Sequence, residues 1–305
     1  MKLTSLSRRR FLATASAAAF AHRPATAAAD PAPLFSFGLI TDAQYADAEP
    51  KGDRHYRATP DKLKRAVDVL AGRKLPFTLH LGDFIDRDFK SFDVLLPILD
   101  GLGHPVHHLL GNHDYDVADA DKPLVAAKLG MPGDYYSFAH AGVRFVMLDT
   151  NDISTYKHPP GPATAAAEAQ LAQYQQDKQP GAKPFNGALG KDQLAWLETT
   201  LDTTTTAVER VIVCGHHPVL PAAPHNLWNP GDLIAAITRR PSVAAYFCGH
   251  NHAGDYAEHQ GRHFVTFRSI LHTPDQTAFS IIHLHPDRIV IEAHGREVAR
   301  ELPLP

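Results

Sequence analysis

Short apolar runs alternate with polar and amphipathic segments along most of the chain. A short apolar run between polar clusters is typical of a buried strand, and such runs occupy 34–41, 77–81, 106–110, 143–148, 211–214 and 243–248. Further strands are predicted at 253–259, 263–268, 279–285 and 288–294. Strands interleaved with helices and followed by a block of strands indicate an α/β fold with mixed sheets.

Helical patterns lie between several of these strands. One helix is predicted to begin at Thr59, as N-cap, with Pro60 in its first turn. Its core face is predicted to consist of apolar residues at helical spacing, namely Leu63, Ala66, Val67 and Leu70. Further helices are predicted over 191–201 and 232–239. The segment 159–184, rich in Pro, Ala and Gln, is predicted to be a mobile surface loop, with an active-site lid as the alternative.

The first 29 residues contain the three parts of an export signal in order. Arg8, Arg9 and Arg10 precede an apolar stretch at 11–21, and small residues fill 25–29. This order is typical of a cleavable signal peptide, and the arginine pair before Phe-Leu resembles the twin-arginine signal that an export machinery reads. We therefore expect cleavage near 27–29, a periplasmic bacterial protein, and a single domain over 30–305. The alternative is a basic, disordered N-terminus.

Composition narrows the functional class. The chain has 305 residues, 44% hydrophobic and 21% charged, which is typical of a globular protein. Its formal charge is −3, and loss of residues 1–29, with five basic and no acidic residues, leaves −8. A nucleic-acid binder would carry a basic surface, so none is expected as a partner. No later segment offers about 20 consecutive apolar residues, so no membrane anchor is expected.

Polar clusters follow five of the predicted strands. They lie at 42–44, 82–86, 111–114, 215–218 and 249–252, and they supply Asp, Asn, Gln and His side chains. Loops at the carboxyl ends of parallel strands converge on one crevice. Oxygen and imidazole donors without thiolates suit Mn²⁺, Fe or Zn²⁺. The sequence therefore predicts one metal site, although any single Gly-Asp or Gly-His pair is common in proteins. The two cysteines, Cys214 and Cys248, are expected to be buried free thiols.

The order D-A-Q, G-D-x-x-D, G-N-H-D, G-H-x-P and G-H-x-H resembles the calcineurin-like metallophosphoesterases. The segments D-A-Q-Y-A-D, N-G-A-L-G and L-W-N resemble, more narrowly, the manganese-dependent ADP-ribose/CDP-alcohol diphosphatases. This resemblance spans about residues 34–285. It implies a four-layer α-β-β-α sandwich with two mixed β-sheets, and a centre of two divalent ions, Mn²⁺ with Fe or Zn²⁺ as alternatives.

The resemblance also implies the metal ligands. Asp83 would bridge the two ions, because a carboxylate has two oxygens. The other implied ligands are Asp42 and His252 for one ion, with Gln44 as a weak ligand or just behind it, and Asn112, His216 and His250 for the other. Asp86 stands where purple acid phosphatases carry a metal-binding tyrosine, so a tyrosinate–iron site is not expected.

The reaction implied by the resemblance is hydrolysis of a nucleoside diphosphate conjugate such as ADP-ribose or a CDP-alcohol. A hydroxide bridging the ions would attack phosphorus, releasing a nucleoside monophosphate and a phosphorylated sugar or alcohol. His113 would stabilise the transition state or protonate the leaving group, and Asp114 would orient His113 by accepting its other N–H.

Substrate contacts are predicted from aromatic and phosphate-binding residue types. The candidate aromatic platforms are Tyr45, Tyr56 and Trp228, and the candidate phosphate contacts are Arg57, Asn186 and Gly187. Ordinary packing is the alternative for each. Two other functions remain open: a different metallophosphoesterase acting on phosphodiesters or phosphomonoesters, and a non-catalytic periplasmic protein that binds phosphate or nucleotide.

Overall fold

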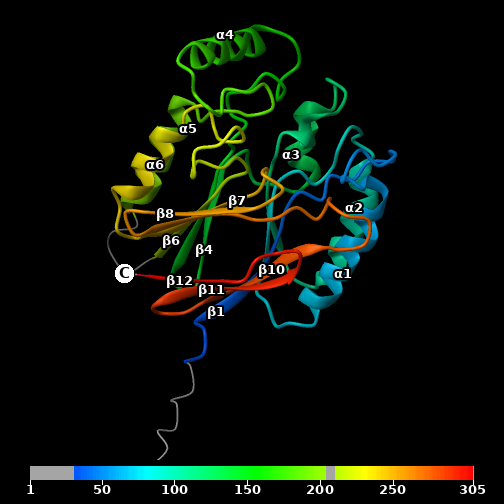
Figure 1. Ribbon diagram of the computed structural model, residues 1–305, viewed down its shortest axis with the longest axis vertical. Helices are drawn as coiled ribbons and strands as arrows, with labels where there is room; N and C mark the ends of the chain where they lie inside the picture. Colours follow the sequence, from blue (N-terminus) through cyan, green and yellow to red (C-terminus); the bar gives the residue numbers. More distant parts are fainter. Residues whose placement is uncertain (1–30, 204–209, 305) are drawn as a thin grey trace, which may run out of the picture. The chain divides into compact units, whose positions relative to one another are not determined.

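The computed structural model describes residues 31–203 and 210–304, so the predicted signal peptide lies outside the described chain. From Ala32 onward the described chain forms one compact unit. It contains two six-stranded sheets, each with parallel and antiparallel pairs. Figure 1 shows α1 and α2 outside one sheet, and α5 and α6 outside the other.

The first sheet joins three parallel strands from the early chain to three antiparallel strands from its end. Its order is β12 (Arg300–Pro303), β11 (Arg288–Gly295), β10 (Ala278–Leu284), β1 (Phe35–Ile40), β2 (Thr78–Leu81) and β3 (Val106–Leu109). The parallel pairs are β1–β2 and β2–β3. The carboxyl ends of β1, β2 and β3 therefore lie at the same edge.

The second sheet has the same mixed character. Its order is β4 (Tyr136–His140), β5 (Val143–Met147), β6 (Arg210–Cys214), β7 (Val243–Cys248), β9 (Arg262–Thr266) and β8 (Asp255–His259). Strands β5, β6, β7 and β9 run parallel, and β4 and β8 are antiparallel edge strands. Thus β6 and β7, which precede two of the polar clusters, are neighbours in the sheet.

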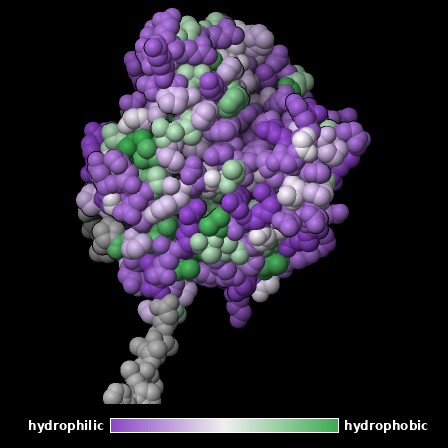
Figure 2. Space-filling model, viewed as in Figure 1, coloured by the Kyte–Doolittle hydropathy of each residue, from purple (hydrophilic) through white to green (hydrophobic). Residues whose placement is uncertain are grey.

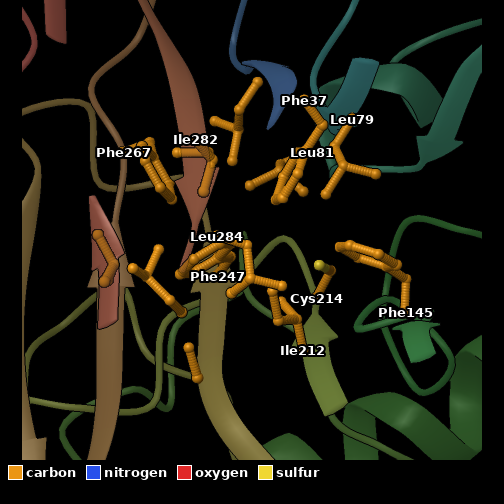
Figure 3. Packing of buried hydrophobic residues seen from close by; sticks show 14 of the residues in the cluster. Phe37, Leu79, Leu81, Phe145, Ile212, Cys214, Phe247, Phe267, Ile282 and Leu284 are labelled. Atoms are coloured by element: carbon orange, nitrogen blue, oxygen red, sulfur yellow. The ribbon is translucent and has the colours of Figure 1, made fainter. Parts of the chain in front are cut away.

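Three apolar layers hold these elements together. Between the sheets, Phe37, Leu79 and Leu81 face Phe145 and Ile212 (Figure 3). A second layer packs the first sheet against α1 (Thr59–Ala71) and α2 (Ser91–Leu99), and a third packs the second sheet against α5 (Lys191–Asp202) and α6 (Pro230–Thr238). The predicted four-layer α-β-β-α sandwich is confirmed.

Details at the start of α1 and in the 159–184 segment differ from prediction. Thr59 is the first residue of α1 and makes no cap; its hydroxyl donates to the Ala43 carbonyl, 2.9 Å away, and ties α1 to the loop after β1. The 159–184 segment contains a helix, α4 (Pro162–Gln176), so the expectation of a loop throughout is wrong. Alanine and glutamine are good helix formers, and Pro162 lies in the first turn.

The remaining helical segments are short. The structure has 3-10 turns at Tyr56–Ala58, Asp100–Leu102, His113–Tyr115 and Lys122–Leu124, and a four-residue helix, α3 (Val125–Lys128). Figure 2 shows a mainly hydrophilic surface on the visible face, with hydrophobic residues scattered over it. Among the described residues, no helix is long and apolar enough to cross a membrane.

Both cysteines are buried and free, as expected. Cys214 belongs to the layer between the sheets (Figure 3), whereas Cys248 belongs to the layer under α5 and α6. The two thiols thus face opposite sides of the second sheet, which keeps them apart.

Candidate metal centre

Sharp turns at the strand ends create the site. Asp42, Gln44, Asp83 and His250 all have positive φ, at 51°, 45°, 55° and 66°. Left-handed backbone is unfavourable for residues other than glycine and concentrates at functional sites. Gly111 allows the loops after β2 and β3 to touch, since a Cβ there would lie 2.1 Å from Asp83 Oδ1.

Asp83 lies at the centre of two ligand clusters. Fully buried, it belongs both to a group with His216 and His250 and to a group with Asp42 and His252. In each group the candidate ligand atoms lie within 4.8 Å of one another. The structure thus brings the two halves of the predicted two-metal set together on one shared carboxylate.

The three histidines are held so that one ring nitrogen of each faces this centre. His216 Nδ1 lies 2.8 Å from the Leu81 carbonyl, leaving Nε2 3.3 Å from Asp83 Oδ2. His250 Nε2 contacts Asn186 Oδ1 at 2.7 Å, and its Nδ1 lies 3.2 Å from His216 Nε2. A partner on the outer nitrogen fixes the ring and leaves the inner nitrogen for a metal.

His252 is held through a relay of a different kind. Its Nδ1 lies 2.8 Å from His272 Nε2, and His272 Nδ1 lies 2.9 Å from Asp53 Oδ2. The inner nitrogen, Nε2, is 3.3 Å from Asp42 Oδ1. A carboxylate thus supports a ligand histidine through a second imidazole.

Two buried side-chain oxygens without partners show that this donor set fits cations. Gln44 Oε1 and Asn112 Oδ1 make no hydrogen bond in the described structure, although both are buried. The Gln44 Nε2 atom lies 2.7 Å from Asp83 Oδ2 and 2.9 Å from His252 Nε2.

The electrostatics of Asp83 also suit metal binding. Burial alone would raise the pKa of this carboxyl, but the charges of His216 and His113 hold it well below its usual range. Asp83 therefore stays ionised. Its Oδ1 also accepts the His113 backbone N–H at 2.8 Å, which joins the loop after β3 to the centre.

The prediction that Asp114 orients His113 is wrong. Asp114 does not orient it; the Asp114 carboxylate accepts backbone N–H groups of the loops after β2 and β3, including Asp83 (2.9 Å) and Gly111 (2.9 Å). Asp86 instead approaches His113, with its Oδ1 3.2 Å from Nδ1. Successive side chains of the turn at His113–Tyr115 point in different directions, so neighbours in sequence do not share a partner.

A cavity of about 480 Å³ opens beside the centre. Several predicted site residues line it, namely Gln44, Asn112, His113, His250 and His252, together with residues that sequence reasoning missed, namely Asp53, Arg54, Phe185, His225, Asn251, Ala253 and His272. Phe185 is 42% exposed, and its ring centroid lies 5.9 Å from those of both His225 and His250. Its only sequence signal was its position immediately before Asn186.

The predicted aromatic platforms do not reach this cavity. Trp228 is fully buried and donates its indole N–H to the Lys183 carbonyl. Tyr56 is also buried, beneath the Arg87 guanidinium. Tyr45 packs partly buried against the layer beneath α1 and α2. All three are packing residues.

The predicted phosphate contacts are also placed elsewhere. Arg57 is exposed and pairs with Asp47 and Glu49. Asn186 is buried behind His250, and its Oδ1 contacts Nε2 of that candidate ligand. Gly187 leaves no room for a side chain, because a Cβ would lie 2.4 Å from the Thr150 carbonyl oxygen.

Comparisons with known proteins agree with this geometry. A sequence profile of the calcineurin-like phosphoesterase family matches residues 35–254. The chain belongs to this family. Manganese-dependent ADP-ribose/CDP-alcohol diphosphatases from Bos taurus and Oryza sativa subsp. japonica are 30% and 31% identical to it, over 86% and 88% of this chain and 92% and 94% of theirs.

A solved structure gives the same result for this calcineurin-like phosphoesterase. The crystal structure of a dimetal phosphatase from Danio rerio matches with a TM-score of 0.80 at 27% identity, covering 90% of this chain and 100% of that one. The protein is thus a metal-dependent phosphohydrolase with a two-metal centre. The alternative of a non-catalytic binding protein is not supported.

Proposed function

We propose that this phosphoesterase hydrolyses the phosphoanhydride of nucleoside diphosphate conjugates, such as ADP-ribose or CDP-alcohols, and uses Mn²⁺. The products are a nucleoside monophosphate and a phosphorylated sugar or alcohol. The observation that carries the proposal is a single cavity that joins the metal ligands to the half-exposed ring of Phe185. Base stacking on an aromatic ring beside a phosphoryl site suits a nucleotide, and the names of the relatives support this substrate class.

Hydrolysis would depend on the bound cations and on His113. When bound, two divalent cations withdraw charge from the phosphoryl group and supply a nucleophile at neutral pH. Burial lowers the pKa of His113, but Asp83 and Asp86 outweigh it and raise the pKa to about 8. Asp86 Oδ1 lies 3.2 Å from Nδ1 of His113, which leaves Nε2 to donate a proton to the leaving oxygen.

A substrate panel tests the proposal. Purified mature protein loaded with Mn²⁺, Zn²⁺ or Fe²⁺ is assayed on ADP-ribose, CDP-choline, an aryl phosphodiester and an aryl phosphomonoester. We expect the highest kcat/KM with Mn²⁺ on a diphosphate conjugate, and nucleoside monophosphate among the products. Activity confined to the aryl esters would contradict the proposal and favour another phosphodiesterase or phosphomonoesterase of the same family.

We also propose that residues 1–29 direct export to the bacterial periplasm through the twin-arginine route. The ordered basic, apolar and small-residue segments of the sequence support this proposal.

A further inference from the structure

Arg54 places a cation in the cavity without a protein partner. It lines the cavity and is partly buried, yet its guanidinium makes no hydrogen bond or ion pair within residues 31–203 and 210–304. Arg57, three positions later, pairs with Asp47 and Glu49 outside the cavity. An unpaired guanidinium beside a phosphoryl site is available to an anionic ligand.

The backbone of Arg54 is well anchored. Its N–H donates to the Lys51 carbonyl at 3.1 Å, and the Lys51 N–H donates back at 3.0 Å. It also pairs in antiparallel fashion with His272, whose ring supports the ligand His252. The backbone of Arg54 is therefore fixed in position next to the metal centre.

The charge of Arg54 reaches both sides of the cavity. Burial, followed by the charges of His252 and Arg54, lowers the pKa of His225, which lies beside Phe185. On the catalytic side, the same guanidinium opposes the carboxylates that raise the pKa of His113. Arg54 thus contributes positive charge to the part of the cavity between His113 and Phe185.

We propose that Arg54 binds the phosphoryl group next to the one under attack, and thereby selects diphosphates over simple phosphodiesters. This inference rests on the proposed function. The metal centre can hold one phosphoryl group, whereas the second keeps a negative charge and two non-bridging oxygens. The planar guanidinium fork matches such oxygens.

Arg54 is the only Lys or Arg among the described residues that line the cavity. The neighbouring Asp53 carboxylate makes no ion pair with Arg54 in the described structure; its Oδ2 instead lies 2.9 Å from His272 Nδ1.

Kinetics on two substrate types test the proposal. Arg54→Gln, Arg54→Lys and the control Arg57→Gln are compared with the wild type on CDP-choline and on bis(p-nitrophenyl) phosphate, which has one phosphoryl group. We expect Arg54→Gln to lower kcat/KM for CDP-choline by about 30- to 100-fold, mainly through KM, as for loss of a charge-assisted hydrogen bond. Its activity on the monophosphoryl diester should change less than about threefold. Arg54→Lys should be intermediate, and Arg57→Gln should match the wild type on both substrates.

Binding measurements separate failure of this inference from failure of the proposed function. The dissociation constants of AMP and α,β-methylene-ADP are measured by calorimetry on Mn²⁺-loaded protein, whichever substrates are turned over. We expect the wild type to bind the diphosphate analogue more tightly, and Arg54→Gln to remove that preference. An unchanged preference in Arg54→Gln, no preference in the wild type, or equal kinetic losses on both substrates would overturn the role of Arg54.

Discussion

At the residue scale, the contact between Asp86 and His113 determines which imidazole nitrogen can reach a substrate. Asp86 is 2% exposed, and its Oδ1 lies 3.2 Å from His113 Nδ1. Nε2 is the ring nitrogen left to face the cavity. Asp114, although adjacent to His113 in sequence, binds backbone N–H groups of two loops. The two carboxylates should therefore give different mutant phenotypes.

We expect His113→Asn to lower kcat by about 10²- to 10⁴-fold, as for loss of a general acid, and Asp86→Asn to lower it by a smaller factor. Both variants should retain two metal ions, because neither side chain is among the ligands of the centre. Steady-state kinetics and elemental analysis measure the two quantities. Asp114→Asn serves as the comparison, and we expect its main effect on stability. Loss of metal from His113→Asn, or full activity of Asp86→Asn, would contradict these assignments.

The sequence predicted the clustering of the candidate metal ligands better than their surroundings. This clustering could be found because each candidate follows a buried strand in a recognisable motif, and parallel strands end at one edge of a sheet. The partner of His113 could not, because the direction of a side chain in a 3-10 turn depends on the loops packed around it. The cavity wall at Phe185 and His225 likewise depends on contacts between loops distant in sequence.

At the element scale, the segment around Gly187 joins the second sheet to the metal ligands. The Gly187 carbonyl accepts the Trp228 backbone N–H at 2.8 Å. Thr150, whose carbonyl oxygen lies against Gly187, accepts the backbone N–H groups of His216 and His217 on its hydroxyl, each at 3.2 Å. A side chain at Gly187 would therefore push on a residue that supports a metal ligand.

We expect Gly187→Ala to lower the free energy of unfolding by about 1–3 kcal/mol, the usual cost of overpacking. Its Cβ would lie 2.4 Å from the Thr150 carbonyl oxygen and 3.1 Å from that of Ile153. Urea denaturation measures the change. Gly231→Ala is the matched control, because a Cβ there meets no atom within 4 Å and the residue lies in α6. Equal stability of the two variants would show that the Gly187 segment can move aside.

Among the elements that were not predicted, α4, β4 and β12 show little apolar contrast, whereas α2, which buries Phe92, Leu95 and Leu99, is strongly apolar. Helix α4 buries only Thr164, Ala167 and Leu171, so its sequence has no clear apolar face. The edge strands β4 and β12 are partly exposed, whereas the central strands such as β2 and β7 are buried throughout and read as apolar runs. A strand that is buried on both faces forms a continuous apolar run, which makes it easier to predict from the sequence.

At the scale of the whole molecule, the metal centre is part of the folded interior. Asp42, Asp83 and His216 are fully buried, and His250 and His252 are less than 10% exposed. These ligands come from loops after four strands in both sheets, so the site is complete only when the sheets have packed. Metal loading and folding should therefore occur in the same compartment.

This coupling makes the export route testable. If the signal is of the twin-arginine type, which carries folded proteins, the metal is acquired before export. We expect Arg8→Lys combined with Arg9→Lys to leave the unprocessed chain in the cytoplasm, although the charge is unchanged. Cell fractionation and the size of the chain on immunoblots report its location and processing. Arg10→Lys, which alters the third arginine but keeps the pair, should be exported like the wild type. Normal processing of the double variant would show that the arginine pair is not read, and that the chain leaves the cytoplasm by a route that does not require a folded, metal-loaded protein.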